Sequence, residues 1–351
     1  MLLHAVASGL ALAAPIVAQQ IYDIWSTTWQ RDNLFTYKNL NPNPINFVSP
    51  GSTGTSDIVV TDSTVYQQMI GFGAALTDSS AKLLSELKST DSDTYWDLLN
   101  LLFDRNGAGF TYLRIPLGAS DFSASVYSFD DVSGDTSLSS FNINNAPSYL
   151  FSTLQDIVGI NSYLKIQITP WSPNEPQNSN PSYPTNLIDP YWEGQVATQL
   201  RSLMNENGFS DTIIIGYDHN WDDAGDVNYY SRNAAMWNLV LDGEGNPKTP
   251  GTTSCGGSDP CRGVVTVNSN GTYHLNQEFY AIAQASKAIL PKDSGGPFGQ
   301  RIEVAVNGNQ NLVVSAFVTH RVSSSDWLRY SLATYTFPVG VTTLWWYAAS
   351  E

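Results

Sequence analysis

A glutamate between two prolines is the residue of this sequence best suited to acid or base chemistry. Glu175 lies in the stretch Pro173-Asn174-Glu175-Pro176, shortly after the run 164–171, whose alternating apolar residues predict a β-strand. Barrel enzymes place acids and bases just past the carboxyl ends of such strands. We therefore interpret Glu175 as a candidate general acid. A solvated carboxylate in a proline-rich loop is the alternative that this stretch leaves open.

Two other stretches place polar side chains on or after apolar strands. Arg114 lies inside the apolar run 110–118, where a buried guanidinium needs either a carboxylate or a polar cavity. The sequence does not decide between a supporting salt bridge and a binding site. His219 lies in a polar and aromatic stretch, 218–223, directly after the apolar run 211–217. This position favours ligand binding over a surface loop.

The elements that must position these residues alternate between strands and helices. A helix is expected to begin at a cap among Thr77, Asp78 and Ser79. The apolar patterns predict further helices at 93–103, 150–158 and 193–207, and strands at 57–61, 65–70, 110–118, 164–171, 211–217 and 234–241. This order indicates a parallel α/β arrangement with function at the carboxyl ends of the strands.

The last part of the chain has a different pattern. After Cys261 the sequence predicts one helix at 277–289 and short strands at 302–306, 312–319 and 334–341. We interpret this part as an all-β accessory unit that the amino-terminal strands complete.

The composition favours a neutral, hydroxylated ligand. The 351 residues are enough for one large domain or two. Acidic residues outnumber basic ones by 32 to 16, and the net charge of −16 comes with no basic cluster, so neither nucleic acid nor an anionic membrane is an expected partner. The 10 Trp and 18 Tyr suit stacking on sugar rings, although most of them are expected to fill the core.

Several features predict secretion. Residues 1–18 have the pattern of a signal peptide, and no later apolar stretch is long enough to span a membrane. Cys255 and Cys261 flank a short loop and are expected to form a disulfide in an oxidising compartment. Asn270 begins the one glycosylation sequon. Two cysteines and four scattered histidines offer no metal constellation, and we expect neither a metal nor a cofactor.

A set of ordered motifs resembles glycoside hydrolase family 30. The motifs are GFGAALTDSSA, YLRIPLGASDFS, YSFDD, PWSP, NEPQNSNPSYPT, GYDHNWDD, MWNLVLD and QEFYAIAQASKAILP, and together they span nearly the whole mature chain. They are similar to the secreted fungal branch that cleaves β-1,6-glucan, with lysosomal glucosylceramidase a distant relative. The resemblance implies a (β/α)8 barrel beside a β-sandwich built from both chain ends. It also implies retaining hydrolysis of a β-glycosidic bond.

The resemblance gives a role to each matching residue. Glu175 corresponds to the general acid/base, and Asn174 to the partner of the sugar 2-hydroxyl. Subsite residues that would position the glucosyl unit are Arg114, Trp171, Trp237, His219 and one of Asp130 and Asp131. A retaining site needs a second carboxylate about 5–5.5 Å from the first, and an acid that works near neutral pH needs a raised pKa.

The chain departs from the family pattern in three places. Pro173 is joined directly to Asn174, Tyr230 is joined directly to Ser231, and a third shortening falls near 331–333. The segments that the family places at these junctions include the strand with the nucleophilic Glu, and no matching sequence is present. We interpret the chain as a mis-spliced or mis-predicted version of an enzyme, in preference to evolved loss of function.

These observations predict an architecture. We expect a signal peptide at 1–18, sandwich strands at 19–65, a truncated (β/α) barrel at 66–245 and a β-sandwich at 246–351. About five of the eight strands of a TIM-type barrel are recognisable in the sequence.

The predicted function is a secreted, extracellular and monomeric retaining β-glycosidase for β-1,6-glucan or another β-linked polysaccharide. The chain as written is expected to be inactive because the nucleophile segment is missing. The alternative is a non-catalytic carbohydrate-binding relative or a non-functional isoform. The absence of a Gly-x-Ser-x-Gly elbow argues against a Ser-His-Asp hydrolase.

Overall fold

The structure is a computed structural model, and it contains two compact units. It describes residues 19–48, 57–132, 135, 137, 139–170, 190–213, 232–249, 260–292, 295–308, 311–319 and 333–348. One unit takes in residues 1–55 and 322–351, and the other takes in residues 56–321. This division differs from the predicted boundaries, because residues 246–321 fall in the same unit as the parallel sheet.

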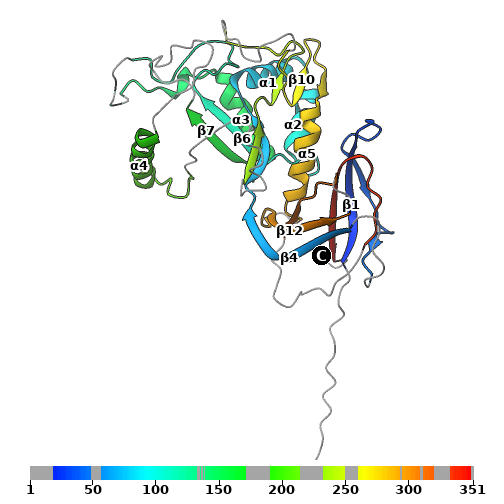
Figure 1. Cartoon of the computed structure of the whole chain (residues 1–351). Coiled ribbons are helices and arrows are strands. Elements are labelled where there is room, and N and C mark those ends of the chain that lie inside the picture. The colour runs from blue at the N-terminus through cyan, green and yellow to red at the C-terminus, as the bar shows by residue number, and fades with distance from the viewer. Residues whose placement is uncertain are drawn as a thin grey trace, which may run out of the picture. The chain divides into compact units, whose positions relative to one another are not determined.

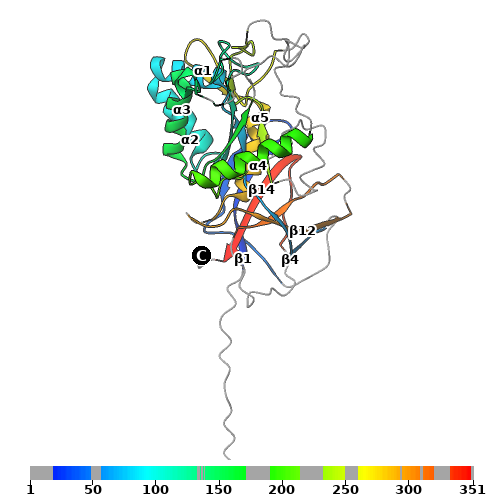
Figure 2. The ribbon, with the colours of Figure 1, turned by 90° about the vertical axis from the view of Figure 1, so that its left-hand side faces the viewer.

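The first unit is one sheet built from both ends of the chain. Strand β1 (Gln19–Thr28) pairs antiparallel with β14 (Gly340–Ala348), and the two run side by side in blue and red (Figures 1 and 2). On its other side β1 pairs with β2 (Thr36–Asn39) and β3 (Ile45–Asn46). A strand was predicted at 334–341, but β14 begins at Gly340, where a Cβ atom would lie 2.1 Å from the Thr27 carbonyl oxygen.

A buried carboxylate ties the strands of this sheet together. The carboxylate of Asp23, on β1, accepts hydrogen bonds from the Tyr37 hydroxyl at 2.6 Å, the Tyr347 hydroxyl at 3.0 Å and the Asn39 amide at 3.2 Å. The ring of Trp25 stacks on Tyr37 with 5.0 Å between the centroids. Because these partners come from β2 and β14, one side chain connects three strands.

The second unit contains the parallel sheet that the sequence predicts. Its strands lie in the order β7 (Lys165–Pro170), β6 (Tyr112–Leu117), β5 (Gly71–Ala75) and β8 (Asn233–Met236), and each neighbouring pair is parallel. All five residues of β5 are buried. Their small side chains let the neighbouring backbones approach, and a Cβ atom at Gly73 would lie 1.8 Å from the Tyr112 carbonyl oxygen.

Three helices pack together beside this sheet. They are α1 (Asp78–Thr90), α2 (Ser92–Phe103) and α3 (Ser148–Ile160), seen as one group in Figure 2. The Thr77 side chain caps α1 by accepting a hydrogen bond from the Ser80 amide at 3.2 Å, as the sequence allowed. Between the helices, the Asp156 carboxylate accepts hydrogen bonds from the Tyr95 hydroxyl at 2.6 Å and the Lys88 ammonium at 2.5 Å.

The remaining elements lie in the second unit as well. A second sheet joins β4 (Asp57–Gln68), β12 (Gln300–Asn307) and β13 (Ala316–Val318), and a third joins β9 (Val240–Leu241), β10 (Val265–Val267) and β11 (Tyr273–Leu275). Helix α5 (Gln277–Ile289) packs against β5, and its Ser286 hydroxyl donates a hydrogen bond to the Gly109 carbonyl at 2.6 Å (Figure 1). Helix α4 spans Pro190–Glu206, and a 3-10 turn spans Ile143–Asn145.

Three predicted strands of the parallel region differ from the structure. The run 65–70 belongs largely to β4, which pairs antiparallel with β12, and the parallel sheet uses β5 at 71–75, where no strand was predicted. The run 234–241 forms two short strands, β8 and β9, because Val240 and Leu241 pair with β10 in another sheet while 233–236 pair with β5. In the predicted strand 211–217, residues 211–213 form no β-strand, and residues 214–217 lie outside the described residues. The described residues therefore supply four parallel strands in this sheet, one fewer than predicted.

The contact between β5 and β6 predicts a large effect of one methyl group. Gly73→Ala should lower the free energy of unfolding by about 3 kcal/mol or more, because the new Cβ atom meets backbone that cannot move aside. Urea denaturation measures this change. Gly159→Ala is the matched control: it lies in α3 with no atom within 4 Å of the added Cβ, and it should raise stability by about 0.5–1 kcal/mol. Equal effects of the two substitutions would contradict the close packing described.

Candidate active site

The carboxyl ends of four parallel strands meet at one edge of the sheet. After β5 comes Asp78, after β6 comes the segment 118–131, after β7 comes Trp171, and after β8 comes Trp237. Function in α/β folds collects at this edge because the loops that follow the strands converge there. Among the described residues, Arg114 lies on β6, Asp78 follows β5 and Trp237 follows β8, three neighbouring strands of this sheet.

Arg114 faces an aromatic ring. It lies on β6 between Ala75 of β5 and Gln167 of β7, and it is 9% exposed. Its guanidinium carbon is 4.9 Å from the centre of the Trp237 ring, which is the geometry of a cation–π contact. The sequence left open whether Arg114 forms a supporting salt bridge or lines a binding site. Its contact with Trp237, a candidate subsite residue, favours the binding site.

Trp237 is held from a second direction by Phe122. The two rings meet edge to face with 6.2 Å between their centroids, and Phe122 itself is fully buried in a cluster with Leu241 and Cys261. Phe122 follows β6 and Trp237 follows β8, so the ring is fixed between segments that are far apart in the sequence. This contact holds the half-buried Trp237 ring in one orientation at the edge of the sheet.

Asp78 is a buried carboxylate that the sequence analysis considered only as a helix cap. It is 4% exposed, and both of its carboxylate oxygens are buried. Burial raises its pKa to about 7, and the nearby polar groups of Ser123 and Ala124 oppose the shift only in part. The signal that could have found it is its place three residues after β5, the same kind of position that singled out Glu175.

The two aspartates of the YSFDD motif differ in environment. Asp130 is 3% exposed, its Oδ1 accepts a hydrogen bond from the Val132 amide at 3.1 Å, and its Oδ2 has no partner among the described residues. Asp131 is exposed and accepts a hydrogen bond from the Ser128 hydroxyl at 2.5 Å. Of the pair that the sequence left open, Asp130 is the one with an unused buried oxygen.

Four of the predicted site residues lie outside the described residues. They are Trp171, Asn174, Glu175 and His219. The predicted roles of these residues therefore remain predictions. Among the described glutamates, none follows a strand of the parallel sheet, because they lie in α1, α4 and α5, in the turn after β9 and in β12.

Two other predicted features can be placed. Cys261 is disulfide-bonded, and the only other cysteine of the sequence is Cys255, which lies outside the described residues. Asn270 is exposed in the turn between β10 and β11, where its side-chain oxygen accepts a hydrogen bond from the Thr272 hydroxyl at 2.7 Å. Within the described ranges, no three His, Cys, Asp or Glu side chains are grouped as a metal site would require, and no helix is long and apolar enough to cross a membrane.

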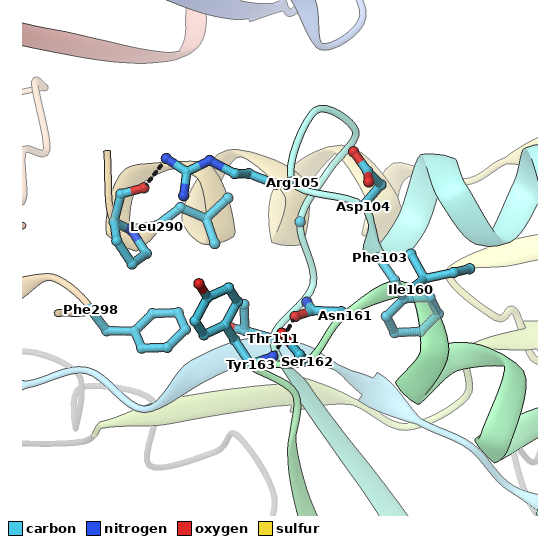
Figure 3. A pocket seen from close by; sticks show the side chains of 12 residues that line it. Phe103, Asp104, Arg105, Thr111, Ile160, Asn161, Ser162, Tyr163, Leu290 and Phe298 are labelled. Atoms are coloured by element: carbon cyan, nitrogen blue, oxygen red, sulfur yellow. Dashed lines mark hydrogen bonds between the residues drawn. The ribbon is translucent and has the colours of Figure 1, made fainter. Parts of the chain in front are cut away.

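A separate hollow of about 240 Å³ lies at the opposite edge of the sheet (Figure 3). Thr111, just before β6, and Tyr163, just before β7, line it, so it belongs to the amino ends of the strands. Arg105 donates a hydrogen bond to the Pro291 carbonyl at its rim. Its position separates it from the edge that carries Asp78 and Trp237.

The environment of Asp78 predicts how stability depends on pH. A carboxyl group whose pKa is raised on folding stabilises the protein fully below its ordinary value of 3.8, and this contribution is lost as the pH rises toward 7. Between pH 4.5 and 7.5 the chain should therefore lose about 3 kcal/mol of stability relative to the Asp78→Asn variant, which carries no charge. Urea denaturation at both pH values measures the difference. Asp93→Asn, at an exposed position in the first turn of α2, is the control and should leave the pH dependence unchanged. Parallel profiles for the chain and Asp78→Asn would contradict the assignment.

Comparison with known proteins identifies relatives of the chain. Residues 69–181 match the glycosyl hydrolase family 30 TIM-barrel domain. Endo-1,6-β-D-glucanase BGN16.3 of Trichoderma harzianum is 24% identical over 367 positions, which cover 68% of this chain and 73% of that enzyme. Putative glucosylceramidase 4 of Caenorhabditis elegans is 31% identical over 123 residues, covering 34% of this chain and 23% of that protein.

Two solved structures resemble the fold. The endo-β1,6-glucanase BT3312 matches with a TM-score of 0.65 and 20% identity, over 85% of this chain and 89% of that chain. SrfJ from Salmonella typhimurium matches with a TM-score of 0.72 and 16% identity, over 93% of this chain and 99% of that chain. At these identities the likeness concerns the fold, and it supports an α/β barrel architecture.

The alignment with the fungal enzyme contains long gaps in this chain. Its 367 positions take up only 68% of the 351 residues, so more than a hundred positions of that enzyme face no residue here. The matched range 69–181 nevertheless contains β5, β6 and β7 with the helices α1 to α3 that pack beside them. Residues 69–181 therefore match the barrel domain of glycoside hydrolase family 30, and the wider chain is similar to fungal endo-1,6-β-D-glucanases.

Proposed function

We propose that the chain is a version of a retaining β-glycosidase that acts outside the cell on β-1,6-linked glucan. The observation that carries the proposal is the contact between Arg114 and Trp237 at the carboxyl edge of the parallel sheet, where the buried Asp78 follows the neighbouring strand β5. A buried acid, a cation and a half-buried aromatic ring are groups that can hold a neutral sugar ring. The relatives named as endo-1,6-β-D-glucanases supply the substrate class.

The proposal assigns roles to the site residues. Glu175 acts as the general acid/base, and Asn174 hydrogen-bonds the 2-hydroxyl of the sugar. Arg114, Trp237, Trp171 and His219 position the glucosyl unit. Asp130 joins them in preference to Asp131, because its buried Oδ2 is available to a sugar hydroxyl. Asp78 is added to this set because its buried carboxyl group follows β5 at the same edge of the sheet.

The chain itself is proposed to lack retaining activity. Retention needs two carboxylates about 5–5.5 Å apart, one of which attacks the anomeric carbon. No glutamate in the described parts of the chain follows a strand of the parallel sheet, and Glu175 lies outside those parts. The long gaps against the Trichoderma enzyme agree with a missing nucleophile segment.

A mis-spliced or mis-predicted gene accounts for these gaps more simply than evolved loss. The direct junctions Pro173/Asn174 and Tyr230/Ser231 join motifs without disturbing the reading frame of either side. Transcript sequences that span both junctions distinguish the two explanations. Additional exons at the junctions support the enzyme, and abundant transcripts with the junctions intact support a different role for this chain.

That different role is a non-catalytic carbohydrate-binding protein. It is favoured by the preserved contact between Arg114 and Trp237, because an aromatic wall binds sugar without a nucleophile. An exposed Asn270 sequon and a disulfide-bonded Cys261 agree with secretion in either case. A monomer that uses no cofactor is part of the same proposal.

The inactivity of the chain gives a direct prediction. Purified protein of this sequence should release no reducing ends from β-1,6-glucan above the background of buffer alone. The Glu175→Gln variant is the matched control and should be indistinguishable from the chain. Turnover by the chain that disappears in Glu175→Gln would show that the nucleophile is supplied from elsewhere and would refute the inactivity.

Sugar binding gives a second prediction that does not need turnover. Trp237→Ala should weaken the binding of a β-1,6-linked gluco-oligosaccharide about fivefold to tenfold, because a stacked ring contributes on the order of 1 kcal/mol. Isothermal titration calorimetry measures the affinity. Trp29→Ala is the control, since Trp29 is 80% exposed and belongs to the other unit. A larger loss in Trp29→Ala than in Trp237→Ala would place the binding surface elsewhere.

A further inference from the structure

A fully buried hydroxyl connects the two strand ends that carry Asp78 and Trp237. Thr77 precedes Asp78 after β5, and Asn238 follows Trp237 after β8. The Thr77 Oγ1 lies 3.0 Å from the Asn238 Oδ1, and the two residues are 0% and 3% exposed. This contact bridges residues that are 161 positions apart in the sequence.

The direction of this hydrogen bond follows from its neighbours. The Thr77 hydroxyl has one proton, with the Asn238 Oδ1 at 3.0 Å and the Ser80 Oγ at 3.1 Å as acceptors. An amide oxygen can only accept a proton, whereas a serine hydroxyl can also donate. The Ser80 hydroxyl does donate, to the Val240 carbonyl at 2.8 Å, and it also accepts from the Val240 amide at 3.0 Å. The Thr77 hydroxyl therefore donates its hydrogen bond to the Asn238 Oδ1.

The same hydroxyl also accepts a hydrogen bond. The Ser80 amide donates to Thr77 Oγ1 at 3.2 Å and thereby fixes the first turn of α1, in which Asp78 is the first residue. Asn238 is fixed in turn by its carbonyl, which accepts from the Val264 amide at 2.9 Å, while the next amide, Leu239, donates to the Ala75 carbonyl at 2.9 Å. The Thr77 hydroxyl thus donates one hydrogen bond to Asn238, after β8, and accepts one from Ser80, in α1.

We propose that Thr77 is a positioning residue that sets the orientation of the Trp237 ring against Arg114 through its hydrogen bond to Asn238. Loss of the hydroxyl leaves the Asn238 oxygen buried without a donor, and such an atom turns toward another partner. Asn238 is joined by one peptide bond to Trp237, so this turn moves the indole ring. The inference rests on the proposed function in one respect, the binding of sugar by Trp237.

The experiment follows the ring directly, without sugar or turnover. The full chain is labelled with 5-fluorotryptophan, and the resonance of Trp237 is assigned by its absence from a Trp237→Phe variant. In Thr77→Val this resonance should shift or broaden, whereas in Thr77→Ser, which keeps the hydroxyl, it should stay at its original position. Ser80→Ala is the control: Ser80 is equally buried, in the first turn of the helix that Thr77 caps, and its hydroxyl hydrogen-bonds the Val240 backbone and no atom of Asn238.

The outcomes separate positioning from stability. An unchanged Trp237 resonance in Thr77→Val, or an equal change in Ser80→Ala, overturns the proposal whatever the protein binds. If the resonance moves only in Thr77→Val, the same variant should lose oligosaccharide affinity by about the factor seen for Trp237→Ala, and Thr77→Ser should retain it. If Trp237→Ala itself leaves sugar affinity unchanged, the proposed function fails while the positioning of the ring by Thr77 stands.

Discussion

The close approach of β5 to β6 is the constraint on which the second unit depends. At Gly73 the two backbones leave no room for a Cβ atom, and the whole of β5 is buried. This contact fixes the register that places Ala75 opposite Arg114, and the Leu76 amide then donates to the Arg114 carbonyl at 2.8 Å. On the other side of β5, the register with β8 sets where that strand ends and Trp237 begins.

The candidate site uses this frame to keep opposite charges in different environments. The Arg114 guanidinium lies over the face of the Trp237 ring, and Arg114 is not among the groups that shift the pKa of Asp78. Asp78 instead lies near Tyr127, Tyr149 and the start of α1. Burial raises the pKa of both tyrosines, and the charge of Asp78 raises it further. A carboxyl group that is protonated near neutral pH can donate a hydrogen bond, which an ionised one cannot.

Local patterns predicted the helices well, and they failed where pairing partners decide. The helix at 277–289 was predicted with the observed bounds, because its apolar periodicity and its neighbours mark both ends. The run 234–241 has the pattern of one strand, yet its last two residues pair with β10 in another sheet. The local sequence contains no signal for that pairing. Asp78 was overlooked because Thr-Asp-Ser-Ser is also a common helix start, and its burial comes from segments near 123–127 and 149. The aromatic partner of Arg114 was likewise out of reach, since it lies more than a hundred positions away.

The pairing of β1 with β14 has a consequence for synthesis of the chain. Residues 19–28 are made more than 300 residues before 340–348, the strand that covers one of their edges. Until residues 340–348 are made, Ile21, Ile24 and Trp25 have no β14 beside them, although all three are buried in the finished sheet. An unpaired apolar strand is prone to association with other chains during this interval. Loss of residues 340–348 would therefore leave β1 open to the same association in the finished protein.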